Sequence, residues 1–108
     1  MVRILVIEPE LRARHALRSM LEGAGYQVEI AIDHPDGLAM HRSRPADLII
    51  ADFDEVDQEI GDFGGTRLIA VPGGDRFNTE AARRMGAGAF LPKPFRRDAL
   101  LAAVKSLI

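Results

Sequence analysis

Three side chains in this 108-residue chain are suited to chemistry on phosphoryl groups, namely Asp52, Glu8 and Lys93. Asp52 follows the unbroken apolar run 48–51, and Glu8 follows the apolar run 4–7. A carboxylate can attack a phosphoryl donor as a nucleophile, and a second carboxylate can help to hold Mg²⁺. A lysine ammonium group pairs with phosphoryl oxygens. The residue types therefore indicate phosphoryl transfer, provided that the fold brings these side chains together.

The apolar pattern predicts five strands that alternate with helices. The run 48–51 is typical of a strand buried on both faces in the middle of a parallel sheet. The predicted strands are residues 3–7, 26–32, 47–52, 67–71 and 89–91. Four helices are predicted. The first has apolar residues from Ala13 to Ala24, with Pro9 near its first turn, and the second is a short helix between Asp33 and Pro45. Another runs from Asn78 or Thr79 to Met85, and the last has apolar residues from Leu100 to Ile108.

This order of elements predicts an α/β fold with a doubly wound, five-stranded parallel sheet. Right-handed crossovers and the strand order 2-1-3-4-5 give a flavodoxin-like architecture. In that order the strands that end at Glu8 and Asp52 are neighbours, and Pro72 and Lys93 follow strands that end at the same edge. Residues 53–66 have no clear helical pattern, so we expect the third helix to be shortened or missing.

The sequence resembles a known family, the receiver (CheY-like) domain of two-component response regulators. The resemblance rests on residues 6–8, 45–52 and 86–95, of which the last is the most specific, and it covers the whole chain. It implies a single receiver-like domain over residues 1–108 that takes part in phosphorelay signal transduction. It also implies that Asp52 is the phosphoacceptor aspartate.

The same resemblance implies roles for the residues around Asp52. Lys93 matches the lysine that contacts the phosphoryl group, and its peptide bond to Pro94 is expected to be cis. Glu8 matches the first acid of the pair that binds Mg²⁺, so Glu8 and Asp52 form a weak metal site. Phe90 matches the switch aromatic residue of the family.

The chain departs from the family pattern at three places. Pro9 replaces the second acid of the metal-binding pair, and Pro72 replaces the Ser or Thr whose hydroxyl follows the phosphoryl group. The segment between Asp52 and Pro72 is shorter than is usual in the family. We therefore expect an atypical receiver with a degenerate Mg²⁺ and switch site. In the alternative, Glu8 pairs with Lys93 without a metal and Phe90 is a static core residue.

Composition limits the setting and the partners. The net charge is −2, there is no cysteine, and no apolar run approaches the ~20 residues of a membrane span, so we expect a cytoplasmic protein without disulfides. Residues 47–62 carry seven acids and no Lys or Arg, whereas residues 76–108 carry seven bases and two acids. This basic third of the chain is either a docking face or an ordinary solvated surface.

The partners that the resemblance implies are a histidine kinase or phosphotransfer protein, and a second copy of the chain. The homodimer would use the face formed by the predicted helix from Asn78 or Thr79 to Met85, the fifth strand and the last helix. We expect no membrane contact, no direct nucleic-acid contact and no enzymatic activity of its own.

Two other function classes remain as alternatives. The first is a receiver fold kept for phosphorylation-independent protein interaction or dimerisation. The second is a small flavodoxin-like enzyme or cofactor binder, which is disfavoured because residues 8–10 lack the Gly, Ser or Thr that cradle a phosphate. We expect His15, His34 and His41 to lie on helix surfaces or ends with structural roles.

Overall fold

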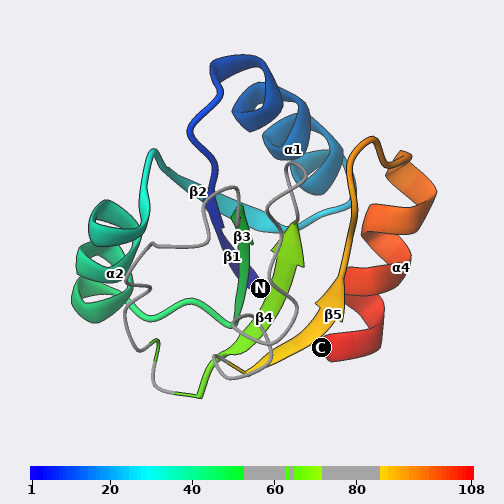
Figure 1. Cartoon of the computed structure of the whole chain (residues 1–108). Coiled ribbons are helices and arrows are strands. Elements are labelled where there is room, and N and C mark those ends of the chain that lie inside the picture. Colours follow the sequence, from blue (N-terminus) through cyan, green and yellow to red (C-terminus); the bar gives the residue numbers. More distant parts are fainter. Residues whose placement is uncertain (53–62, 64, 72–85) are drawn as a thin grey trace.

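The computed structural model of the chain describes residues 1–52, 63, 65–71 and 86–108. The strands are β1 (Arg3–Ile7), β2 (Gln27–Ala31), β3 (Leu48–Asp52), β4 (Arg67–Val71) and β5 (Ala87–Phe90). The helices are α1 (Leu11–Gly23), α2 (His34–Ser43) and α4 (Arg97–Leu107). Figure 1 shows the helices arranged around a central sheet.

All five strands pair in parallel in the order β2-β1-β3-β4-β5, as predicted. Ile7 of β1 pairs with Ala51 of β3, so Glu8 and Asp52 stand next to each other at the carboxyl ends of the two central strands. The chain therefore has the doubly wound architecture in which ligands and chemistry collect at this edge.

The sheet is packed on both faces. One face meets α1 and α4 and the other meets α2, which Figure 1 shows on the opposite side of the sheet. Successive residues of β3 alternate between the two cores, since Ile50 joins the α1 and α4 side whereas Ile49 and Ala51 join the α2 side. Every residue of β3 is buried, which is why this strand has no polar residue before Asp52.

Acidic side chains cap the N-termini of α1 and α2. The Glu10 side chain accepts the N–H groups of Arg12 and Ala13, so α1 begins after Glu10 and Pro9 lies outside its first turn. Asp33 caps α2 as predicted, because its carboxylate accepts the N–H of Asp36. Both acids satisfy amide groups that have no partner inside the helix.

The fifth strand starts earlier than the predicted range 89–91. It spans Ala87–Phe90, and its pairing with β4 is irregular between Leu68 and Ile69. Gly88 falls at this irregularity, where an added Cβ would lie 3.0 Å from Leu107 of α4. The small residues that look like a turn in the sequence instead let the last helix pack closely on the strand.

Several predictions fall on residues outside the described ranges. These are the role of Pro72, the helix from Asn78 or Thr79 to Met85, and the shortened third helix between β3 and β4. Within the part of the chain that the structure describes, no helix has the length and apolar character needed to cross a membrane.

Candidate functional site

Two carboxylates are buried together at the carboxyl edge of the sheet. Glu8 is 2% exposed and Asp52 is 5% exposed. Each follows directly from the end of a central strand, as the sequence predicted. Burial of two carboxylates in one place is costly unless a cation or hydrogen-bond donors compensate them.

Lys93 supplies that cation. It lies two residues beyond Leu91, whose N–H donates to the Ala70 carbonyl and so continues the pairing with β4. The Lys93–Pro94 peptide bond is cis, as predicted. The Lys93 ammonium group donates a hydrogen bond to Oε1 of Glu8, and its Nζ lies 3.8 Å from Oδ2 of Asp52. The structure therefore brings together the three residues that the sequence singled out.

The ammonium group is closer to Glu8 than to Asp52. This arrangement matches the alternative in which Glu8 and Lys93 form an ion pair. The Lys93 side chain is 31% exposed, so its charge also faces solvent at the rim of the site. Among the residues that the structure describes, Lys93 thus pairs with both buried carboxylates, and Asp52 is the one that lies farther from it.

The loop after β1 is held in place by its own side chains. The Glu10 N–H points at Oε2 of Glu8 at 3.3 Å. The Arg14 guanidinium donates to the carbonyls of Glu8 and Pro9 at 3.1 and 2.8 Å. Both carboxylate oxygens of Glu8 are therefore already engaged by donors of the chain itself.

The described residues fit poorly to the Mg²⁺ ion that the family resemblance implies. Pro9 offers no side-chain oxygen, and both oxygens of Glu8 accept hydrogen bonds. Among the residues that the structure describes, no three His, Cys, Asp or Glu side chains gather in a way that could hold a metal. Mg²⁺ needs a near-ideal octahedral shell of oxygens, which Glu8 and Asp52 do not provide between them.

The cap of α1 predicts a pH dependence of stability. The N–H of Ala13, and then that of Arg12, donate to the Glu10 carboxylate and lower its pKa below the ordinary value of 4.5. A lowered pKa means that the charged cap stabilises the fold above pH 4.5 and that this contribution is lost as the pH falls through the folded-state value.

We therefore expect the wild-type protein to melt at a higher temperature than Glu10→Gln. This difference in melting temperature, the margin, should be constant above about pH 5 and should shrink towards about pH 3. Melting followed by circular dichroism across this range measures the margin. A margin that is unchanged at the acid end would show that the Glu10 charge does not stabilise the cap.

Phe90 lies half-buried at the end of β5, on the α2 side of the sheet. Its backbone pairs with Ala70 of β4. Pro72, its predicted counterpart in the switch, lies outside the described residues. Phe90 therefore ends the edge strand of the sheet, and its role as a switch stays a prediction.

The histidines have structural roles and His34 lies at a helix end, as predicted, but two of the three are more buried than a helix surface implies. His15 is exposed, but His34 and His41 are buried on the sheet-facing side of α2. They share that face with Gly37, at spacings of three and four residues. This helical period was the available signal, and it was missed because imidazole rings are more often found near the surface.

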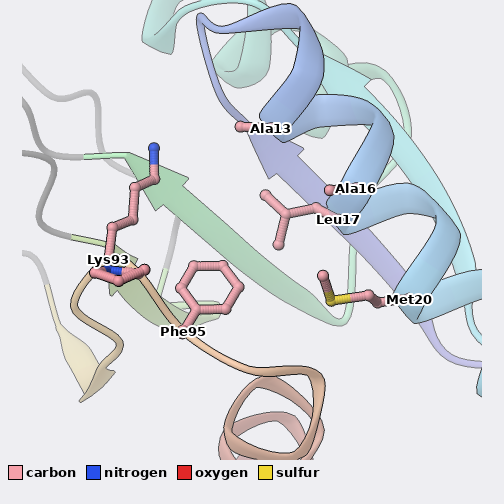
Figure 2. Close-up of a pocket in the computed structure, with 7 residues that line it drawn as sticks. Ala13, Ala16, Leu17, Met20, Lys93 and Phe95 are labelled. Carbon is pink, nitrogen blue, oxygen red and sulfur yellow. The ribbon is translucent and has the colours of Figure 1, made fainter.

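An apolar groove of about 460 Å³ opens beside the site, between α1 and the segment 93–95. Figure 2 shows the ring of Phe95 facing the side chains of Leu17 and Met20, with Lys93 in the same pocket. Ala13 and Ala16 complete the α1 wall, and Ala16 is exposed rather than in the core. The groove and the buried carboxylates thus share one residue, Lys93.

Comparisons with known proteins agree with this geometry. No family model matches the chain. A protein named Response regulator MprA from Mycobacterium bovis is 33% identical over 116 residues, which cover 99% of this chain and 50% of that protein. The structure of a response regulator receiver domain protein from Clostridium thermocellum superposes with a TM-score of 0.85 at 26% identity, covering 100% of this chain and 94% of the other.

The chain is a receiver domain of the response-regulator family. The chemotaxis protein CheY4 of Vibrio cholerae has the same fold, with a TM-score of 0.84 at 23% identity over 100% of this chain and 99% of that one. Membership of this family supports a role in two-component signalling. It spans about half the length of the MprA relatives that it matches.

Proposed function

We propose that this receiver domain accepts a phosphoryl group on Asp52 from a histidine kinase or phosphotransfer protein. The observation that carries the proposal is the buried Asp52 carboxylate with the Lys93 ammonium nitrogen 3.8 Å away, at the carboxyl edge of a receiver fold. This location puts a nucleophile and a cation for the phosphoryl oxygens side by side. The cytoplasmic setting expected from the sequence belongs to the same proposal.

The proposed step is an in-line transfer between two residues. One Asp52 oxygen attacks the phosphorus of a phosphohistidine, so that an O–P bond forms while the N–P bond breaks and its electron pair returns to the imidazole nitrogen. The Lys93 ammonium group pairs with the oxygens of the transferred group. Because Glu8 already neutralises part of the Lys93 charge, we propose that the site is a degenerate one that works with little help from Mg²⁺.

The groove along α1 is the proposed docking surface for the phosphoryl donor. Its apolar walls suit an amphipathic helix, and the small side chains of Ala13 and Ala16 allow such a helix to approach α1 closely. Since Lys93 lines both the groove and the site, a helix seated there would carry its phosphohistidine to the rim above Asp52.

Incubation with a small phosphodonor tests the proposal directly. We expect the intact mass of the wild-type protein to rise by one phosphoryl group, in Mg²⁺ and also in EDTA. The rates in the two conditions should differ by less than about tenfold, or ~1.4 kcal/mol in barrier height. No mass gain in either condition, and none with a cognate kinase, would contradict the proposal. A gain that strictly requires Mg²⁺ would contradict its metal-independent part.

A second candidate function is a phosphorylation-independent interaction module, such as a homodimer that uses β5 and α4. The close Glu8–Lys93 pair favours it, because a lysine that is already neutralised responds less to a new anion. The predicted helix from Asn78 or Thr79 to Met85, which would complete that face, lies outside the described residues. This candidate predicts that Asp52→Asn leaves the oligomeric state unchanged, whereas phosphorylation-dependent association predicts a change on adding the phosphodonor.

A further inference from the structure

Two buried histidines of α2 hydrogen-bond main-chain carbonyls, one at the end of β3 and one within the connection from β3 to β4. Nε2 of His34 lies 2.8 Å from the main-chain oxygen of Asp52. Nε2 of His41 lies 3.1 Å from the main-chain oxygen of Phe63. A carbonyl oxygen can only accept, so each imidazole carries its proton on Nε2 and donates it.

The location of His34 follows from the way in which α2 meets the sheet. His34 is the first residue of the helix, directly after the Asp33 cap. One turn later Gly37 lies against β1 so closely that an added Cβ would come within 2.5 Å of Ile7 Cδ1. This close approach lets the His34 ring reach the end of the neighbouring strand β3, where it is only 5% exposed.

We infer that His34 is a positioning residue for phosphoryl transfer, because it fixes the main chain from which the Asp52 carboxylate projects. The inference rests on the proposed function and deepens it. Asp52 is the last residue of β3, where the register with β4 ends at Val71 and that with β1 ends at Ala51. The His34 hydrogen bond restrains the Asp52 carbonyl at this point, where the strand ends. The Asp52 carboxylate then stays 3.8 Å from Lys93 Nζ. A misplacement of about 1 Å at a reacting atom can cost up to about a hundredfold in rate.

The chain provides a matched control in His41. It lies on the same face of the same helix, is also buried, and also donates to a main-chain carbonyl. Its second ring nitrogen accepts the Ala46 N–H, and it does not contact Asp52 in any interaction that the structure describes. Loss of either histidine should therefore lower stability, but only loss of His34 should slow phosphorylation.

The test compares His34→Leu, His34→Gln and His41→Leu for the rate of mass gain with a small phosphodonor. We expect His34→Leu to fall by about ten- to a hundredfold, His34→Gln to recover most of the rate through its amide donor, and His41→Leu to match wild type. If His34→Leu does not fold, His34→Asn replaces it, since its amide is too short to reach the carbonyl. Equal rates for wild type and the His34 variants would overturn the inference and leave the proposed function standing.

A second readout does not depend on phosphorylation. The ¹³Cγ resonance of Asp52, assigned by its absence in Asp52→Asn, reports the surroundings of the carboxylate. It should shift in His34→Leu and stay in place in His41→Leu. If wild type gains no phosphoryl group, the proposed function fails, and this resonance alone decides whether His34 positions Asp52. A resonance that does not respond to loss of His34 would overturn the inference.

Discussion

Asp52→Asn is expected to abolish phosphorylation, because an amide is not a nucleophile towards phosphorus at neutral pH. Asp52 is the buried acid whose Oδ2 lies 3.8 Å from the Lys93 ammonium nitrogen, farther from it than the Glu8 carboxylate. Intact mass after incubation with a small phosphodonor should show one added phosphoryl group for wild type and none for the variant. The variant should therefore have no measurable rate of phosphorylation, and the detection limit of the mass measurement alone sets the ratio between the wild-type and variant rates.

Asp47→Asn is the matched control for this substitution. Asp47 lies just before the other end of the same strand, is exposed, and accepts the Arg3 N–H at 2.8 Å, a bond that asparagine can keep. It should phosphorylate like wild type. Asp52→Asn should also melt no lower than wild type, because removing one of two buried charges relieves an electrostatic cost. A phosphorylated Asp52→Asn protein would place the acceptor elsewhere.

Lys93→Met is expected to destabilise the fold by about 2 kcal/mol, since it leaves the Glu8 carboxylate buried without its cation. Removing one partner of a fully buried pair costs ~3–5 kcal/mol, and the 31% exposure of Lys93 reduces that figure here. For a domain of this size, such a loss lowers the melting temperature by about 10 °C. Chemical denaturation measures the free energy directly.

The companion variant Glu8→Gln tests the cause of this loss. In the Lys93→Met background it removes the uncompensated charge and should recover at least about half of the lost stability. Lys105→Met, which removes an exposed lysine of α4, should change stability by less than about 0.5 kcal/mol. A Lys93→Met protein as stable as the Lys105→Met protein would show that the buried pair contributes nothing.

The sequence predicted the sheet and the three site residues because their signals are local. A short unbroken apolar run is typical of a strand buried on both faces, and Asp52 stands where that run stops. The strand order then places Glu8 beside it, and Lys93 follows from the last short strand. Each step uses residues that are adjacent in the chain or strands that are adjacent in the sheet.

The remaining features depend on distances between elements, which no local pattern contains. Whether Glu8 binds a metal or pairs with Lys93 depends on where the segment after β5 lies. In the structure this segment places the Lys93 ammonium group against the Glu8 carboxylate. The burial of His34 and His41 depends on main-chain carbonyls far along the chain that accept their protons. For the same reason, the apolar spacing along α1 did not indicate that Ala13 and Ala16 line an open groove.

The most direct test of the central claim is to locate the phosphoryl group in the phosphorylated wild-type protein. Borohydride reduces an aspartyl phosphate to homoserine, which marks the acceptor permanently for peptide sequencing by mass spectrometry. The account predicts homoserine at position 52 and at no other position. A reduced residue elsewhere, such as at Asp54 or Glu55 in the acidic segment, or none after complete treatment with phosphodonor, would contradict it.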